Sequence, residues 1–287
     1  MTNTPSIVEL SRESFWNDLC PELNIDAATA LQDLSGVSRQ HDLDATWEQC
    51  KQLLHTDGYF AYPSWFSETD LHQLRSCIEK LAAVNLPPIF AFVFDEFWEL
   101  MVGLTPLMSD LLEDEFQFLP AIWAWHVTPE NQTAFAPHRD QVQDADDDPL
   151  DYLTLWVPLT DLDHRTSCIC VLPASADLDY QSGVSQATVS NLQDVRTLQG
   201  PAGSVFCWTT GLIHWGTRQS VFGQPRISVG FYVQNPDAEC HYPPPLDFSE
   251  PLSLNQRLAI IGQQILFYSR EAKDDELTLA KNLAQMK

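Results

Sequence analysis

Hydrophobic residues recur at helical spacing in the first part of the chain. A segment over 45–55 has four of them on one side of a helix: Trp47, Cys50, Leu53 and Leu54. Ser67 is a suitable N-cap for a second helix that continues to about Val84, with an apolar stripe of Leu71, Leu74, Ile78 and Leu81. Residues 94–112 show a similar pattern, whereas residues 1–45 are polar and acidic. We therefore expect a helical N-terminal flank over about 1–117.

The pattern changes after residue 118. Short runs rich in Val, Ile, Thr and aromatic residues follow one another, separated by clusters of Pro, Gly and Asp: 121–127, 152–159, 167–172, 204–208 and 226–233. This spacing predicts the antiparallel strands of a sandwich or jelly roll rather than alternating β-α-β units. Residues 252–287 return to helical spacing. The simplest organisation is a single, mainly β domain over 1–287, with a core at about 118–236 and C-terminal helices at about 250–287.

Composition narrows the classes of partner. The net charge is −25, from 15 basic and 40 acidic residues, and no run of Lys or Arg interrupts it. Nucleic acid and anionic membrane surfaces both require a basic patch, so we expect neither as a partner. The first twelve residues do not resemble a signal peptide, and no apolar run approaches the roughly 18 residues of a membrane span. The seven cysteines form no CxxC motif. We expect a reduced, cytoplasmic protein that acts on a small molecule.

Three residues form a candidate metal site. His138 and Asp140 lie in the loop after the first core strand, and His214 follows 76 residues after His138. Two imidazoles and one carboxylate can occupy one face of an octahedral ferrous ion and leave three positions open. The spacing of the pair is not diagnostic alone. With 40 acidic residues in 287, eight histidines should give roughly one His-x-acid pair by chance, and the sequence has two.

The second pair, His55 and Asp57, provides an internal comparison. It ends a helix before the Asp57-Gly58 turn and a short aromatic strand at 59–62, ahead of the β-rich region. We therefore interpret it as structural. His126 precedes His138 by twelve residues; a buried, hydrogen-bonded histidine is the simpler interpretation there than a spare ligand.

Arg226 is the candidate cosubstrate clamp. It lies twelve residues after His214 and begins a run of apolar residues that is interrupted by Ser228. A keto-diacid that chelates iron through its keto-acid end needs its far carboxylate held, and a guanidinium can do this through two hydrogen bonds. Ser228 lies on the same face of the strand. An arginine on the solvated face is the alternative, and Arg218 is a second candidate for the clamp.

With these residues in order, the chain resembles the phytanoyl-CoA dioxygenase family of Fe(II)/2-oxoglutarate oxygenases. The likeness covers roughly residues 50–235. The segments that carry it are 57–60, His138-x-Asp140, 155–163, 171–175, 203–206, His214 and Arg226. The resemblance departs from the family pattern in the turn at 164–167 and in Pro173-Ala174-Ser175-Ala176.

The resemblance implies a double-stranded β-helix in which His138, Asp140 and His214 bind Fe(II) and act in catalysis. It implies that Arg226, helped by Ser228, binds the far carboxylate of 2-oxoglutarate, and that Trp156 lines the cosubstrate pocket. It further implies O2 as cosubstrate, decarboxylation of 2-oxoglutarate to succinate, and oxidation of a substrate C–H bond, with hydroxylation as the usual outcome. A CoA ligand is disfavoured because the chain has few basic residues for its phosphates.

Aromatic residues flank the candidate ligands and are candidates for the substrate side: Trp123, Trp125, Phe135 and Trp215. They could equally fill the core of the sandwich. The acidic run over 144–151 could be a lid that attracts a cationic substrate, although such loops are usually just solvated.

Two alternative functions stay open. One is a cupin-type metalloenzyme that does not use 2-oxoglutarate, which a different role for Arg226 would favour. The other is a non-catalytic jelly-roll binding protein, against which the intact set of ligand residues argues.

Overall fold

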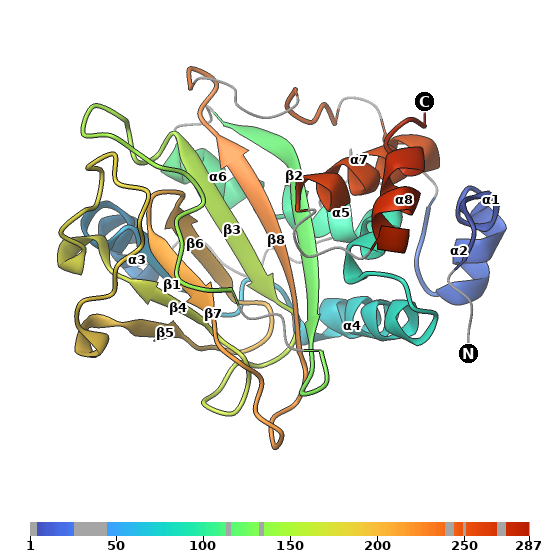
Figure 1. Cartoon of the computed structure of the whole chain (residues 1–287), viewed down its shortest axis with the longest axis horizontal. Coiled ribbons are helices and arrows are strands. Elements are labelled where there is room, and N and C mark those ends of the chain that lie inside the picture. Colours follow the sequence, from blue (N-terminus) through green and yellow to red (C-terminus); the bar gives the residue numbers. More distant parts are fainter. Residues whose placement is uncertain are drawn as a thin grey trace.

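Two antiparallel β-sheets form the centre of the structure, a computed structural model that describes residues 5–25, 45–112, 116–131, 135–238, 244–248, 251–268 and 274–286 (Figure 1). The large sheet has the strand order β1-β6-β3-β8-β2 and the small sheet the order β5-β4-β7. The strands of the large sheet are β1 (Tyr59–Tyr62), β2 (Gln117–Val127), β3 (Tyr152–Pro158), β6 (Val205–Thr209) and β8 (Arg226–Gln234). Those of the small sheet are β4 (Ile169–Leu172), β5 (Arg196–Leu198) and β7 (Ile213–Gly216).

Alternation along the strands divides the interior into two cores. Trp156 of β3 and Phe206 of β6 face the small sheet, where they pack with Val171 of β4. Their sequence neighbours Leu155 and Cys207 point the other way, into a larger core shared with the helices. Because side chains in a strand alternate between faces, the sheet can present an aromatic inner face to a site and an aliphatic outer face to the helices.

Helices cover the outer face of the large sheet, and helices also occur near both ends of the chain (Figure 1). They are α1 (Ile7–Leu10), α2 (Glu13–Leu19), α3 (Ala45–Asp57), α4 (Glu68–Ala83), α5 (Asp95–Val102), α6 (Thr105–Leu111), α7 (Leu254–Phe267) and α8 (Asp274–Leu283). Short 3-10 segments are η2 (Pro88–Val93), η3 (Ala174–Ala176) and η4 (Leu192–Asp194). The Ser67 side chain caps α4, as the sequence predicts, by accepting a hydrogen bond from the Asp70 amide.

A buried ion pair fixes α7 against this layer. Arg257 of α7 lies 2.5 Å from the Asp95 carboxylate at the start of α5, and its guanidinium also donates to the Val93 carbonyl oxygen at 2.8 Å. Both side chains are almost fully buried, at 2% and 4% exposure. A buried pair resists separation because each charge would be left uncompensated. The position of α7 matters because Tyr268, immediately after it, borders the site described below.

The short aromatic strand predicted at 59–62 is confirmed as β1, and it joins the large sheet. This strand pairs with β6 at one edge of the large sheet, from Tyr59↔Trp208 to Tyr62↔Val205. Gly58 makes the turn from α3 possible, because it has φ +76° and a Cβ there would lie 2.9 Å from Leu212. The segment before the β-rich region therefore contributes an edge strand to the large sheet.

The other predicted elements are confirmed in kind. Helices occur over 45–57, 68–83, 95–111 with a break at 103–104, and 254–283 with a gap in the described residues. The five predicted core strands are present with ends shifted by a few residues, whereas β5 and β7 lie outside the runs predicted as strands. Both are short, at three and four residues. Much of the polar segment at 1–45 lies outside the described residues; within it, α1 and α2 are short helices.

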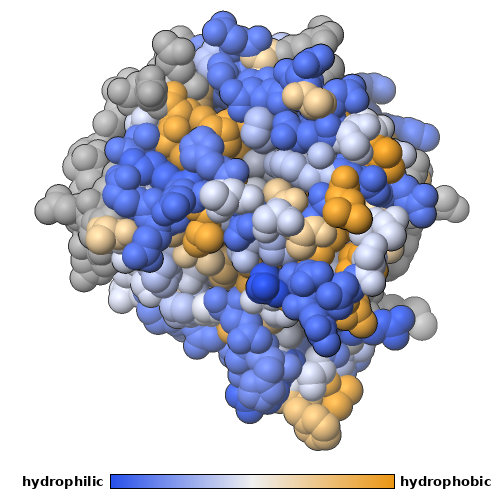
Figure 2. All heavy atoms as spheres, turned by 90° about the vertical axis from the view of Figure 1, so that its left-hand side faces the viewer, coloured by the Kyte–Doolittle hydropathy of each residue, from blue (hydrophilic) through white to orange (hydrophobic). Residues whose placement is uncertain are grey.

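The surface over the small sheet is mainly hydrophilic. Figure 2 shows hydrophobic residues there as separate spots among hydrophilic ones, not as one continuous face. Some apolar side chains in loops are strongly exposed, such as Leu178 at 95% and Phe222 at 86%. Single exposed apolar residues are normal on a protein surface. Among the described residues, no helix is long and apolar enough to cross a membrane.

Candidate metal centre

The two candidate histidines lie side by side because their backbones pair. The His138 amide donates to the His214 carbonyl oxygen at 3.1 Å, and the His214 amide donates back to His138 at 2.9 Å. This bridge attaches the loop after β2 to strand β7 of the small sheet. The imidazole centroids are 4.4 Å apart as a result. Residues 76 positions apart in sequence therefore present their side chains together.

Arg139, between the two loop ligands, holds the loop from the other side. Its guanidinium lies 2.7 Å from the Asp177 carboxylate, and both side chains are only 3% exposed. It also donates to the Gly211 carbonyl oxygen at 2.6 Å, close to the start of β7. The alternation of a short extended segment sends Arg139 away from the two ligands that flank it. The middle residue of the His-x-Asp motif thus anchors the loop.

Hydrogen bonds fix the proton positions of both imidazoles. His138 Nδ1 lies 2.9 Å from the Ala136 carbonyl oxygen, and His214 Nδ1 lies 3.1 Å from that of Leu212. A carbonyl oxygen only accepts, so each Nδ1 carries a hydrogen, and in the neutral ring the lone pair is on Nε2. Burial also lowers the pKa of His214 and so favours the neutral ring. The nearby Asp140 carboxylate has the opposite but smaller effect. Both rings therefore present ligand atoms.

Asp140 is oriented by Thr154 of β3. The Thr154 hydroxyl donates to Asp140 Oδ2 at 2.8 Å and leaves Oδ1 to face the imidazoles. Oδ1 lies 3.5 Å from His214 Nε2 and 3.8 Å from His138 Nε2. Thr154 was not predicted as part of the site. Its sequence signal is weak, namely that it lies two residues before Trp156 and so on the same face of β3.

The three residues fit a metal ion. One ligand atom from each of His138, Asp140 and His214 lies within 4.8 Å of the other two. The separations from Oδ1 exceed hydrogen-bond length, so three lone-pair atoms converge with no proton between them. Such an arrangement is unfavourable by itself and is suited to a divalent cation. Two histidines and a carboxylate with open positions are the usual ligands of non-haem Fe(II).

A cavity of about 70 Å³ lies between the sheets and is lined by all three of these residues. Arg226, at the start of β8, also lines it and is 1% exposed. Its Nε and Nη1 have no hydrogen-bond partner among the described residues. Burial lowers the pKa of Arg226 to about 10, which still leaves it charged at neutral pH. A buried, charged donor facing a cavity indicates a place for an anionic group.

Other unpaired polar atoms lie around the same cavity. Trp156 and Trp208 both line it, and within the described part of the chain neither indole Nε1 has a hydrogen-bond partner. Arg226 Cζ lies 5.6 Å from the Trp156 ring. The Ser228 hydroxyl is likewise buried and unpaired in the described structure, on the same strand face between Arg226 and Gly230, although Ser228 is not among the described residues that line the cavity. Such a concentration of buried donors without acceptors is unusual unless a ligand pairs with them.

Of these, Trp208 escaped prediction. Its ring centroid lies 5.0 Å from that of His214. The residue two positions earlier in β6, Phe206, shares its face. The alternation in 205–209 was a usable signal, but it does not say which sheet face meets the metal.

Three of the four predicted substrate-side aromatics border the cavity: Trp123, Trp125 and Phe135. Gly230 allows the indole of Trp125 to lie over β8, because a Cβ there would be 3.0 Å from the ring. Trp215 is not among the described lining residues. It follows His214 in β7 and therefore points to the opposite face of the small sheet.

The alternative candidates lie elsewhere. Arg218 is exposed, as is His55, while Asp57 accepts a hydrogen bond from the Ser175 hydroxyl at 2.5 Å. His126 points to the outer face of β2 and has a pKa lowered by burial. The acidic run over 144–151 contacts the loop at 181–183, for instance through Gln181, whose side-chain amide donates to the Asp147 backbone carbonyl oxygen at 2.8 Å. None of these residues is among the described residues that line the cavity.

No protein-family model matches the sequence, and no curated protein matches it. Solved structures do. ThoJ, a non-heme monooxygenase, aligns with a TM-score of 0.55 at 13% identity over 82% of this chain and 99% of that one. The alpha ketoglutarate-dependent carbocyclase SnoK from nogalamycin biosynthesis gives 0.53 at 16% identity, over 72% and 93%. The epimerase SnoN, in complex with Fe3+, alpha ketoglutarate and nogalamycin RO, gives 0.52 at 15% identity, over 73% and 96%. The chain therefore shares its fold with non-heme, alpha ketoglutarate-dependent enzymes.

Proposed function

We propose that this protein is a non-haem Fe(II)- and 2-oxoglutarate-dependent oxygenase that oxidises a C–H bond of a small-molecule substrate. The observation that carries the proposal is Arg226, a buried charge whose unpaired donors face the same cavity as three convergent metal-ligand atoms. A metal site alone would fit many enzymes. A metal site with a buried guanidinium nearby fits a cosubstrate that has a chelating end and a distant carboxylate.

Each residue has a defined task in this proposal. His138, Asp140 and His214 would hold Fe(II), with Thr154 orienting the carboxylate. Arg226 and the Ser228 hydroxyl would bind the far carboxylate of 2-oxoglutarate, and Trp156 would form a wall of its pocket. The bound iron supplies activation of O2. In a hydroxylation, substrate, O2 and 2-oxoglutarate would give the alcohol, succinate and CO2. The buried position of Arg226 excludes water from its pairing with the carboxylate and so strengthens it.

We further propose that the two facing sheets form a double-stranded β-helix in a single domain, as in the phytanoyl-CoA dioxygenase-like enzymes that the sequence resembles. The strand order and the core shared by the two sheets support this. Fatty acyl-CoA does not follow as the substrate, since the cavity has Arg226 as its one described cationic lining residue.

Anaerobic spectroscopy tests the proposal. Fe(II) and 2-oxoglutarate together should give a metal-to-ligand charge-transfer band in the wild type, and both His138→Ala and Asp140→Ala should lose it. His55→Ala is the matched control, because it belongs to the second His-x-Asp pair and is exposed; it should retain the band. If the wild type binds Fe(II) but gives no band and releases no succinate, a cupin-type metalloenzyme becomes the better interpretation.

A further inference from the structure

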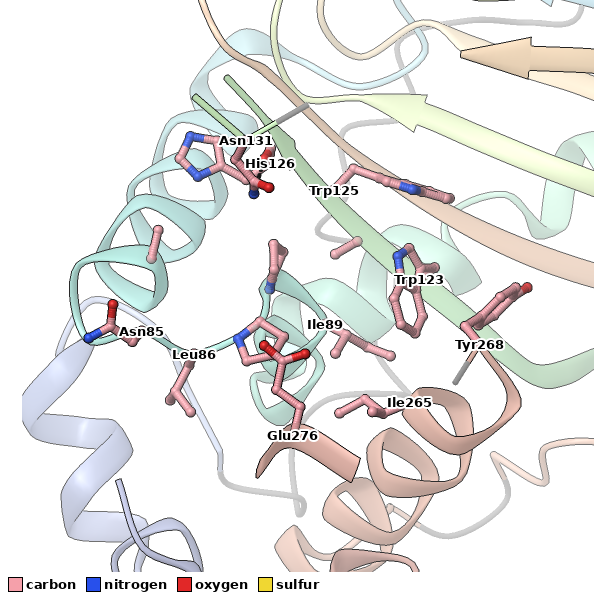
Figure 3. Close-up of a pocket in the computed structure, with 14 residues that line it drawn as sticks. Asn85, Leu86, Ile89, Trp123, Trp125, His126, Asn131, Ile265, Tyr268 and Glu276 are labelled. Atoms are coloured by element: carbon pink, nitrogen blue, oxygen red, sulfur yellow. Dashed lines mark hydrogen bonds between the residues drawn. The ribbon is translucent and has the colours of Figure 1, made fainter. Parts of the chain in front are cut away.

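A second cavity, of about 320 Å³, lies along the edge strand β2 (Figure 3). It is bordered by β2, the end of α4 with the segment that follows it, and the C-terminal helices α7 and α8. In sequence its walls come from Ala82, 85–89, 123–126, Asn131, Ile265, Tyr268 and Glu276. Only the folded chain brings these segments together, and none of them carries a metal-ligand motif.

Three aromatic residues are common to this cavity and the one at the metal centre: Trp123, Trp125 and Tyr268. Trp123 and Tyr268 pack against each other with ring centroids 4.7 Å apart. The two spaces are therefore neighbours with a shared aromatic wall. A molecule bound in the larger space would contact the same rings that border the metal-centre cavity.

The two volumes suggest different occupants. Cavities that bind drug-sized ligands usually measure about 300–1,000 Å³. The space beside the metal centre, about 70 Å³, lies well below this range and already contains the donors that suit 2-oxoglutarate. The 320 Å³ cavity lies within the range. A substrate of ordinary size therefore has room for its body in the second cavity and not beside the cosubstrate.

The lining defines the chemistry of that body. Figure 3 shows Trp123, Ile89, Ile265 and Tyr268 together on one side of the cavity. Flat rings pack well on such a surface, because indole and phenol faces offer a large contact area. His126 and Asn131 lie toward another end and offer neutral hydrogen-bonding groups.

Charge excludes one class of ligand. Among the described lining residues there is no Lys or Arg, and the one carboxylate is Glu276. Burial lowers the pKa of His126, which keeps its ring neutral. A phosphate or carboxylate would thus have no cationic partner among the described lining residues.

We propose that this cavity is the substrate-recognition part of the active site and binds a hydrophobic ring compound without negative charge. The inference rests on the proposed oxygenase function. In it, the ring system lies against Trp123, Ile89 and Ile265, and the part to be oxidised extends past Trp125 and Tyr268 toward the metal centre. Specificity is then determined by lining residues that are far from the metal motif in sequence: Ala82, 85–89, Ile265, Tyr268 and Glu276.

Two naphthalene probes test this inference by titration calorimetry: 2-naphthalenemethanol, which is neutral, and 2-naphthoate, which is anionic. The wild type should bind the alcohol at least tenfold more tightly than the acid. Ala82→Phe should weaken binding of the alcohol at least tenfold, because Ala82 is exposed on α4 and lines the cavity. Ala83→Phe is the matched control, since the neighbouring residue is also exposed but does not line it.

The charge-transfer band separates this inference from the proposed function. Ala82→Phe should keep the band of Fe(II) with 2-oxoglutarate, and saturating 2-naphthalenemethanol should shift that band in the wild type. Equal binding of both probes, equal loss in both variants, or a band that the alcohol leaves unchanged would overturn the inference while the oxygenase proposal stands. A wild type without any band would instead refute the proposed function, and the calorimetric comparison of the two variants would still report on the cavity.

Discussion

Replacement of Arg226 by methionine should stabilise the protein and weaken cosubstrate binding in the same variant. Burial lowers the pKa of Arg226 well below its ordinary value, to about 10, and the residue is 1% exposed. A base whose pKa is lower in the folded state than in the unfolded chain destabilises the folded state at every pH below about 10, where the group is charged in both states. The shift corresponds to a penalty of roughly 3 kcal/mol. Methionine has a similar length and no charge, so Arg226→Met should raise the free energy of unfolding by about 1–3 kcal/mol.

Cosubstrate binding should change in the opposite direction. Loss of a buried, charge-assisted pairing costs about 2–5 kcal/mol. At about 3 kcal/mol, the dissociation constant of 2-oxoglutarate should rise by roughly two orders of magnitude. Iron should still bind, because His138, Asp140 and His214 are unchanged.

Chemical denaturation measures both effects in one assay. With Fe(II) under anaerobic conditions, 2-oxoglutarate at 100 times its wild-type dissociation constant should stabilise the wild type by about 2.7 kcal/mol. Arg226→Met should gain a few tenths of a kcal/mol at the same concentration. Arg218→Met, an exposed arginine in the loop before β8, should behave as the wild type. If Arg226→Met is less stable than the wild type without 2-oxoglutarate, the residue is structural and the reasoning fails.

Two further results are expected. Thr154→Val removes the hydrogen bond to Asp140 Oδ2 and should weaken Fe(II) binding by about 10- to 100-fold in a metal titration. Thr154→Ser keeps the hydroxyl and should bind Fe(II) as the wild type does. Equal binding by all three proteins would show that the hydrogen bond does not orient the ligand. Burial, Glu96 and Asp95 raise the pKa of Glu99 to about 7. The protein should therefore become less stable as the pH rises from about 4.5 through 7, because the Glu99 carboxyl ionises at a lower pH in the unfolded state than in the folded state. Glu99→Gln should therefore be more stable than the wild type by about 1–2 kcal/mol at pH 8 and equal to it at pH 4.5 in urea denaturation, after allowance for partial solvent screening; a difference that does not vary with pH would contradict this.

The sequence alone predicted the kinds of element and the set of chemical groups. Helical and alternating patterns depend on neighbours a few residues away, so α4 and β8 could be located from local spacing. His138, Asp140, His214 and Arg226 could be chosen as a set because a ferrous site and a dicarboxylate require those side chains. Neither inference needed the distances between segments.

Tertiary structure decided what depends on pairing between distant segments. It placed β1 at the edge of the large sheet, because a sequence of four residues does not indicate that the strand pairs with β6. It also decided which of the two His-x-Asp pairs converges with a third ligand. The backbone bridge between His138 and His214 does this, and no local pattern encodes it.

The same reason separates the residues that were predicted around the site from those that were missed. Trp123 and Trp125 could be proposed from alternation near the metal motif, but alternation cannot say that Trp215 faces away while Trp208 and Tyr268 face in. That depends on which face of each strand meets the other sheet, and on where α7 is held. The sequence by itself thus determined the chemistry available to this protein. Only the packing of its sheets and helices determined which of those groups share a cavity.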